Sequence, residues 1–271
     1  YVRKVQSSKF KVHSSAPSYK LQATSYKLAM AGDKNKDQSY FLYTLTQKQL
    51  KHCLFPLGNL TKQEVRAIAK KKRLPNWDRK DSQGVCFIGK IPMKDFLKSR
   101  IPSRSGLLMG IDGTIIGKHD GAAYYTIGQR HGLGYVGGGE ALAVVATDVK
   151  KNIVYAAPLT HQALFRKKLE CDRLQWIAGR APVLPLRCKA RIRYRQPLQW
   201  CTIQRFKVQS SRFTVEFEVP QRAATPGQAI VLYRGQEMIG GGIIHNTSRL
   251  YEMSLSLRAS RSGKKNNRKR A

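Results

Sequence analysis

The sequence predicts an α/β region followed by two all-β regions. Helical spacing and helix-capping signals lie before residue 103, whereas short β-type runs broken by Gly and Asp-Gly begin at residue 104. The 271 residues, 41% of them hydrophobic, suffice for two or three packed cores. We therefore expect an α/β domain over 1–103, a small β domain over 104–160, a β-barrel over 161–257 and a basic disordered tail over 258–271.

The first region begins like the middle of a domain. The run 1–5 has the pattern of a strand, and the chain opens on Tyr1 rather than Met, so we expect a fragment of a longer protein. Residues 6–38 are rich in Ser, Lys and Gln with little periodicity, which is typical of a long, partly mobile connection.

Two helices are expected next. Leucines recur at near-helical spacing over 42–54, before Pro56 and Gly58 stop the run. Thr61-Lys62-Gln63-Glu64 is a capping box, in which the Thr61 hydroxyl and the Glu64 carboxylate accept hydrogen bonds from free amides at a helix start. The inner face of that helix would carry Val65, Ile68 and Ala69.

Turn signals in the sequence indicate the strands of the two β regions. Asp112-Gly113 between 107–111 and 114–116 is a strong hairpin signal, and 141–147 with 153–157 form a second pair. The barrel strands are then expected at 186–194, 202–208, 213–219, 229–233 and 238–244.

Charge points to a polyanionic partner. Fifty Lys and Arg against sixteen Asp and Glu give a net charge of +34, which favours binding to nucleic acid. A basic, translation-associated surface without a specific site is the alternative. No window approaches the roughly 20 apolar residues of a spanning helix, so no membrane partner is expected.

The cysteines and histidines do not suggest a metal site. The five cysteines show neither CxxC pairing nor zinc spacing, which favours a reducing, intracellular compartment. His119 and His131 are isolated in the sequence, so we expect no metal ligands among them.

A run of alternating cations lies in the first barrel strand. Lys189, Arg191, Arg193 and Arg195 recur with period two, so a continuous strand would place all four on one face, roughly 7 Å apart. This spacing is near the phosphate repeat of a nucleic-acid strand. The alternative is an edge strand whose charges prevent pairing with other chains.

Cys86 has a setting that the other cysteines lack. It lies between Gly84 and Gly89, after Arg79 and Lys80; glycines allow close approach to a substrate, and cations favour the thiolate. Taken alone, however, a cysteine beside Val85 and Phe87 is more often a small buried apolar residue.

Two further segments carry polar groups without a definite role. Lys36-Asp37-Gln38-Ser39 precedes an apolar run, where Asp37 or Ser39 would serve equally well as a helix cap. The run 128–134 is rich in glycine but lacks the Lys-Ser/Thr of a phosphate-binding loop.

Several collinear segments resemble the tRNA-specific 2-thiouridylase family, whose members thiolate the wobble uridine. They cover roughly 1–245 and include Lys36-Asp37-Gln38-Ser39-Tyr40-Phe41-Leu42, Leu54-Phe55-Pro56-Leu57-Gly58, Glu64-Val65-Arg66, the run 81–89, Tyr125-Thr126-Ile127-Gly128-Gln129-Arg130, Arg193-Tyr194-Arg195-Gln196, Thr225-Pro226-Gly227-Gln228 and Gly240-Gly241-Gly242-Ile243-Ile244.

The resemblance implies a mechanism and a set of partners. Cys86 would carry a persulfide and donate its sulfur to C2 of the uridine, after ATP, assisted by Mg²⁺, has adenylated the C2 oxygen. The sulfur would come from a sulfur-relay protein or a cysteine desulfurase, and the chemistry implies a disulfide bond. The residues implied to lie against the tRNA are Lys36, Asp37, Gln38, Arg193, Tyr194 and Gln228.

The resemblance also assigns the first region to the helical end of an ATP-pyrophosphatase (PP-loop) catalytic domain. The family's nucleotide loop and second catalytic cysteine would lie upstream of Tyr1, so this fragment alone is expected to bind RNA without catalysing. A noncatalytic RNA-binding module is the rival interpretation. The segments 157–165 and 175–178 resemble the mitochondrial branch, which favours the mitochondrial matrix over a bacterial cytoplasm.

Overall fold

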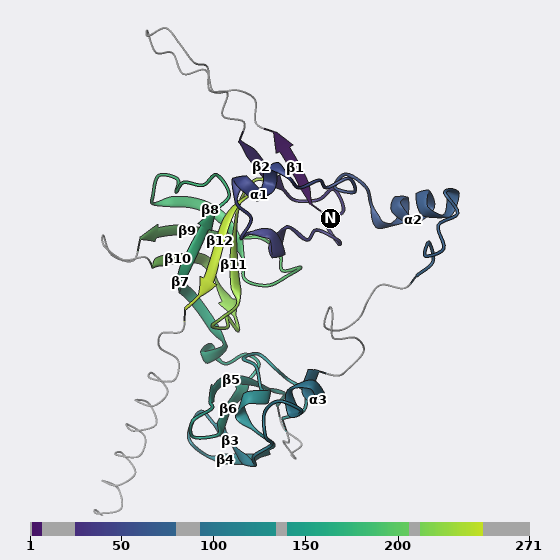
Figure 1. Ribbon diagram of the computed structural model, residues 1–271. Coiled ribbons are helices and arrows are strands. Elements are labelled where there is room, and N and C mark those ends of the chain that lie inside the picture. Colours follow the sequence, from purple (N-terminus) through teal and green to yellow (C-terminus); the bar gives the residue numbers. More distant parts are fainter. Residues whose placement is uncertain (1, 7–24, 80–92, 134–139, 206–211, 246–271) are drawn as a thin grey trace, which may run out of the picture. The chain divides into compact units, whose positions relative to one another are not determined.

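The structure, a computed structural model, describes residues 2–6, 25–79, 93–133, 140–205 and 212–245 (Figure 1). These residues form two compact units. The barrel unit takes its residues from Tyr1–Arg79, Lys167–Val219 and Pro226–His245, and the central unit takes its own from Lys80–Arg166 and Pro220–Thr225. The predicted tail 258–271 lies outside the described residues.

Six antiparallel strands close the barrel. They follow the order β12-β11-β8-β9-β10-β7, and β7 pairs back onto β12 (Figure 1). Gly242 allows a close approach at this seam, because a Cβ atom there would lie 2.6 Å from the Asp172 carbonyl oxygen and 2.9 Å from the Leu174 side chain of β7. The strands are β7 (Phe165–Trp176), β8 (Leu186–Arg191), β9 (Gln199–Arg205), β10 (Phe213–Arg222), β11 (Ala229–Arg234) and β12 (Glu237–Ile244).

The N-terminal segments extend this barrel sheet. β1 (Arg3–Gln6) pairs with β2 (Tyr26–Ala29), and β2 pairs with the start of β12 at Glu237 and Met238. The prediction of a long, partly mobile connection over 6–38 was therefore wrong for the residues of β2. Leu28 and Met238 are fully buried in the resulting core, which explains why these residues form a strand.

The helix predicted over 42–54 is shorter than its leucine spacing indicated. A 3₁₀ helix, η1 (Ser39–Leu42), is followed by α1 (Gln47–Lys51). A capping box starts α1, since Thr46 and Gln49 satisfy each other's backbone amides. Leu50 is the one buried residue of α1, so the core anchors only a single turn of helix.

Helix α2 (Lys62–Lys71) confirms the predicted capping box. The Thr61 amide donates to Glu64 Oε2 at 2.6 Å, and the Glu64 amide donates to Thr61 Oγ1 at 3.2 Å. The expected inner face is not buried against the described residues, and Ile68 keeps 47% of its surface exposed.

The central unit contains a four-stranded sheet of order β4-β3-β6-β5. Both predicted strand pairs are confirmed as antiparallel, and β3 and β6 add a parallel pairing between them. Leu108, Val144 and Val154 are fully buried in one of its cores. The elements are α3 (Met93–Lys98), β3 (Gly106–Gly110), β4 (Ile115–His119), η2 (Ala122–Tyr124), β5 (Leu142–Asp148), β6 (Ile153–Pro158) and η3 (Gln162–Leu164).

Asp120 ties α3 to the end of β4, and this tie predicts a pH effect. Its Oδ2 atom lies 2.9 Å from Lys94 Nζ and 3.1 Å from Lys98 Nζ. Burial disfavours the carboxylate, but these hydrogen bonds outweigh it and lower the pKa from 3.8 to about 2. We expect stability that is present above about pH 4 and lost as the pH falls towards 2. Thermal unfolding from pH 5 to 2 should show this loss in the wild type and a smaller one in Asp120→Asn; identical profiles would contradict the prediction.

None of the helices among the described residues has the length and apolar character needed to cross a membrane.

Candidate nucleic-acid interface

Three segments that are far apart in the sequence meet at the phenol of Tyr40. The Tyr40 Oη atom lies 3.2 Å from the carbonyl oxygen of Ile192 and 2.9 Å from that of Ala229. Burial raises the pKa of this phenol to about 12, so it remains a hydrogen-bond donor at neutral pH. Ile192 and Ala229 immediately adjoin Arg193 and Gln228. The fold thus brings all six predicted tRNA-binding residues into one region of the barrel unit.

Asp37 lies inside this region and not on its surface. Its carboxylate accepts hydrogen bonds from the amides of Ala31 and Ser39 at 3.1 and 3.2 Å, and from Ser39 Oγ at 3.0 Å. The Arg191 guanidinium lies 3.0 Å from Asp37 Oδ2, and both side chains are almost fully buried. Asp37 therefore fixes the segment that presents Lys36, which is half-buried, and Gln38, which is exposed.

Tyr233 completes the buried polar network. The Arg191 guanidinium lies 4.7 Å from the centre of the Tyr233 ring, and the Tyr233 hydroxyl lies 3.0 Å from Ser39 Oγ. A buried charge is tolerated only when it is paired and hydrogen-bonded. The network pairs the Arg191 guanidinium with Asp37, although Arg191 Nε has no hydrogen-bond partner among the described residues. The residues before η1 are in this way bonded to the outer face of β8.

The predicted strand carrying four cations was wrong beyond Arg191. Lys189 and Arg191 do alternate with the buried Cys188 and Ala190, but β8 ends at Arg191. The chain then turns, because the Ile192 amide donates to Gln196 Oε1 at 2.9 Å and the Gln196 amide donates to the Arg193 carbonyl at 3.2 Å.

Arg193, Tyr194 and Arg195 are consequently displayed from a turn. Arg195 adopts a left-handed backbone with φ of 63°, a conformation that costs a residue other than glycine of the order of 1 kcal/mol. The surrounding hydrogen bonds hold this conformation in place. Arg195 is exposed, whereas Arg193 and Tyr194 are half-buried.

An exposed aromatic side chain, Phe41, adjoins this turn and was not identified from the sequence. Phe41 keeps 55% of its surface exposed, and its ring centre lies 4.8 Å from that of Tyr194. The Arg195 guanidinium lies 5.3 Å from the Tyr194 ring centre. Residues 39–42 show no alternation of polar and apolar residues. The sequence therefore did not indicate which of the two aromatic rings faces solvent.

Gln228 lies just before β11 and is half-buried. Its backbone carbonyl accepts a hydrogen bond from the Ile244 amide at 2.8 Å. Its Oε1 atom is buried without a hydrogen-bond partner among the described residues. Such an acceptor is available to a donor group of a ligand that reaches it.

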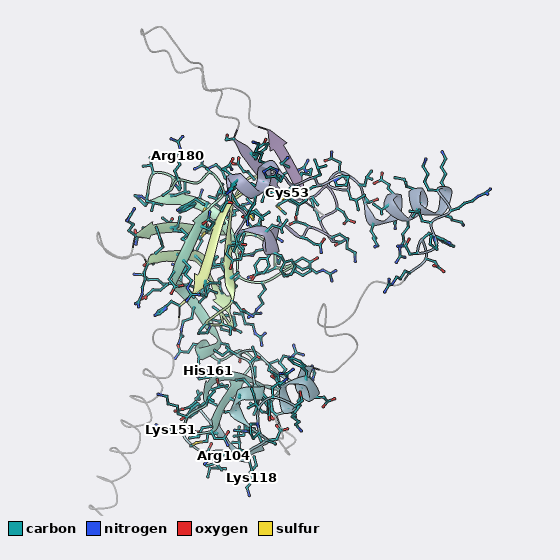
Figure 2. All side chains as sticks on the ribbon, in the orientation of Figure 1. Cys53, Arg104, Lys118, Lys151, His161 and Arg180 are labelled. Carbon is teal, nitrogen blue, oxygen red and sulfur yellow. The ribbon has the colours of Figure 1, made fainter. Side chains whose placement is uncertain are left out.

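Positive charge covers exposed surface on both units. Figure 2 labels Arg104, Lys118 and Lys151 in the central unit and Arg180 in the barrel unit, all of them exposed. The end of α2 adds exposed Lys70, Lys71, Lys72 and Arg73. Phosphate groups would therefore find cations on either unit.

Cys86 lies outside the described residues, together with the whole run 80–92. The four described cysteines, Cys53, Cys171, Cys188 and Cys201, are free, so none of them forms the expected disulfide bond. Burial raises the pKa of Cys171 to about 12, which makes its thiol a poor nucleophile. No group of His, Cys, Asp or Glu within the described ranges could hold a metal ion.

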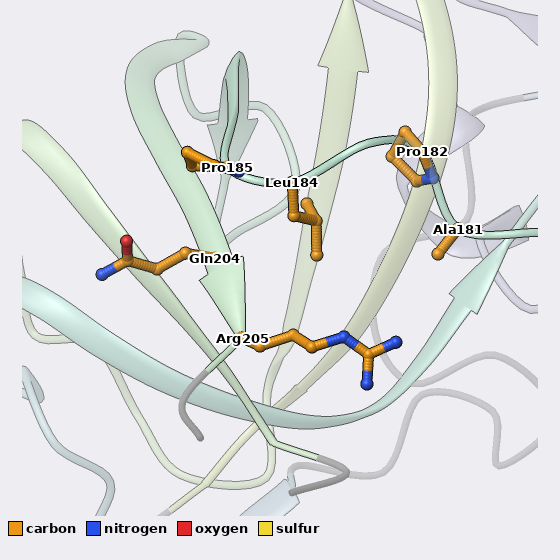
Figure 3. Close-up of a pocket in the computed structure, with 6 residues that line it drawn as sticks. All are labelled: Ala181, Pro182, Leu184, Pro185, Gln204 and Arg205. Carbon is orange, nitrogen blue, oxygen red and sulfur yellow. The ribbon is translucent and has the colours of Figure 1, made fainter. Parts of the chain in front are cut away.

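Two surface cavities are lined by residues other than the predicted tRNA-binding ones. One cavity of about 320 Å³ in the barrel unit is lined by Ala181, Pro182, Leu184, Pro185, Gln204 and Arg205 (Figure 3). A second, of about 380 Å³, lies in the central unit beside Lys94, Lys118 and His119. Neither contains any of the six residues that meet around Tyr40.

The comparisons place the chain in a three-domain class of protein, although its described residues form two compact units. Three family models match consecutive parts of the chain: the tRNA methyl transferase HUP domain over 5–90, the tRNA methyl transferase PRC-barrel domain over 94–158 and the Aminomethyltransferase beta-barrel domain over 166–244. The predicted fold class is confirmed: a PP-loop-like HUP domain, a central β domain and a C-terminal closed β-barrel.

Curated relatives identify the family within this class. The chain is similar to the tRNA-specific 2-thiouridylase MnmA of Nitrosococcus oceani, with 48% identity over 83% of this chain and 62% of the relative. MnmA 2 of Geobacillus kaustophilus is 44% identical over 83% of the chain and 60% of the relative, and MnmA of Coxiella burnetii is 46% identical over 81% and 62%. The chain belongs to the tRNA-specific 2-thiouridylase family. It spans about three fifths of the length of these relatives.

Proposed function

We propose that the protein containing this chain thiolates C2 of the wobble uridine of tRNA, and that the barrel unit supplies part of its tRNA-binding surface. Kinship with the thiouridylases supports the reaction class. The observation that carries the binding role is the meeting of residues 36–38, 193–194 and 228 around Tyr40.

The six tRNA-binding residues would act in two ways. Lys36, Gln38, Arg193, Tyr194 and Gln228 would contact the RNA, since they lie at or near the surface. Asp37 would act through its hydrogen bonds, because its side chain is buried and paired with Arg191. A basic and aromatic surface suits an RNA loop whose bases are unstacked.

The proposed reaction places Cys86 as the sulfur carrier. ATP would convert the C2 oxygen of the uridine into a leaving group by adenylation. The terminal sulfur of a Cys86 persulfide would then attack C2 and expel AMP, and a second thiol would release the product by thiol–disulfide exchange. HUP-domain kinship is consistent with the use of ATP. A sulfur-relay protein or a cysteine desulfurase would load Cys86.

The thiolation assay tests this proposal directly. The full-length protein, given ATP, a persulfide donor and unmodified tRNA, should form 2-thiouridine at the wobble position, as measured by mass spectrometry of digested tRNA. Binding without any sulfur incorporation would favour the noncatalytic RNA-binding module. A parallel reaction with an added methyl donor serves as a control, because two of the family models are described by methyl transfer. Methylation of the tRNA without sulfur incorporation would contradict the thiolation proposal.

The predicted location of the protein can be compared with the organisms of its relatives. The relatives named here come from bacteria, which does not support the mitochondrial matrix that the resemblance favoured.

RNA affinity should depend steeply on salt. With a net charge of +34, we expect phosphate contacts to dominate the binding free energy. Six such contacts predict roughly a thousandfold loss of affinity between about 50 and 200 mM salt. Fluorescence anisotropy with an anticodon stem-loop would measure the slope. An affinity that changes less than about threefold over this range would rule out phosphate-led binding.

A further inference from the structure

The outward position of Phe41 is imposed by its neighbours. In a 3₁₀ helix consecutive side chains point about 120° apart, so residues 39 to 41 cannot all face the core. Ser39 is fully buried between Asp37 and Tyr233, and Tyr40 is buried with its hydroxyl on Ile192 and Ala229. The third direction faces solvent, which leaves a large apolar ring exposed at 55%.

Tyr194 and Arg195 are held beside Phe41 with similar firmness. The turn that carries them is closed by the two hydrogen bonds between Ile192, Arg193 and Gln196. Ile192 also accepts the Tyr40 hydroxyl, so the turn and η1 share one anchor. Arg195 has a left-handed backbone in this turn, and its guanidinium lies over the Tyr194 ring.

We propose that Phe41 and Tyr194, flanked by Arg195, form a stacking site for an unpaired nucleobase of the bound RNA. This inference rests on the proposed function and adds a binding mode to it. Aromatic rings and guanidinium planes are the groups on which unstacked bases lie, and they accept any base because every base has a π-face. Hydrogen bonds hold the backbone of both segments and the two rings contact each other, which reduces the side-chain ordering that binding requires.

Charge at the site favours RNA over a protein partner. Arg195 is exposed beside the aromatic pair, and Lys36 and Arg193 lie on the two segments that carry it. The barrel unit also exposes the rings of Trp77 and Trp200, at 40% and 41%, and two aliphatic side chains, Leu54 at 85% and Val183 at 90%. The two aliphatic residues are the ones used for comparison. They serve as matched controls, because replacing them removes exposed apolar surface without removing a ring.

The test uses full-length protein and an anticodon stem-loop with 2-aminopurine at successive loop positions. Stacking on a ring quenches or enhances the probe's fluorescence when the base is bound. Phe41→Ala and Phe41→Leu should each weaken binding by roughly 5- to 150-fold and abolish the fluorescence change at one position. Phe41→Tyr should retain both properties, and Leu54→Ala should behave like the wild type.

An abasic loop position separates stacking from general loss of fit. Removing the base at the stacked position should weaken binding to the wild type, whereas Phe41→Leu should bind the abasic and the intact loop equally. The stacking site is overturned if Phe41→Leu binds intact RNA as tightly as the wild type, or if both proteins lose the same affinity on the abasic loop. Failure of the wild type to bind RNA at all would instead overturn the proposed function. Loss of affinity for a protein partner with RNA binding intact would identify the surface as a protein interface and also refute the stacking site.

Discussion

The Arg191→Met variant is expected to lose about 3–5 kcal/mol of unfolding free energy, because it leaves the buried Asp37 carboxylate without its counter-charge. Both side chains of this pair are almost fully buried, with exposures of 5% and 0%, and solvent cannot stabilise the remaining charge. Urea-induced unfolding monitored by circular dichroism would measure the loss.

A matched control lies on the same strand. Arg187 pairs with Glu218 at 2.8 Å, but these side chains are 61% and 52% exposed. Arg187→Met is therefore expected to cost at most about 1 kcal/mol. Equal losses in Arg187→Met and Arg191→Met would contradict the role assigned to the buried pair.

A double variant sharpens the interpretation of this ion pair. Asp37→Leu combined with Arg191→Met removes both charges, so it should recover much of the stability lost by either single change. RNA affinity should nevertheless stay reduced in the double variant, because the hydrogen bonds from Ala31 and Ser39 to the carboxylate are also lost. Full recovery of RNA affinity would show that Asp37 does not position the neighbouring RNA-binding residues.

The Cys86→Ser variant of the full-length protein is expected to lose 2-thiouridine formation to below about a thousandth of the wild-type rate, as for the removal of other covalent nucleophiles. A serine hydroxyl cannot carry a sulfur atom as a persulfide. RNA affinity should remain unchanged, since Cys86 is not among the residues proposed to hold the RNA. The assay is tRNA thiolation with ATP and a persulfide donor, followed by mass spectrometry.

Cys53→Ser provides the control for this variant. Cys53 is a free, half-buried thiol of the barrel unit that has no place in the proposed reaction. It should retain wild-type thiolation. Undiminished 2-thiouridine formation by Cys86→Ser would refute Cys86 as the sulfur carrier, and equal losses in both variants would point to a general sensitivity to cysteine replacement.

Features that depend on neighbours in sequence were predictable, and those that depend on distant partners were not. The capping box of Thr61 and Glu64 and the hairpin at Asp112-Gly113 formed as expected, because each is stabilised by residues only a few positions apart. The burial of Arg191, by contrast, was not predicted, because it depends on a pairing with Asp37, 154 residues earlier. No local pattern contains that partner.

The candidate site shows the same division. The resemblance selected the six residues that meet around Tyr40, but it could not show that Asp37 is buried while Phe41 is exposed. Both outcomes follow from the bonds of Ser39 and Tyr40 to Tyr233, Ile192 and Ala229, which are remote in sequence. Which of several neighbouring side chains reaches the surface is decided by such tertiary contacts.

One edge of β12 is shared, with β2 paired to its beginning and β7 to its remainder. Completing that edge requires residues near 28 and near 175 to reach the same strand near 240. These pairings close long loops of the chain, so much conformational entropy must be lost before they form. Such long-range pairing is typical of slow folding. Until β2 arrives, the amide and carbonyl groups of Glu237 and Met238 form an open sheet edge. That edge is a site where another chain can add a strand; β2 covers it, and β1 becomes the outer strand of the sheet.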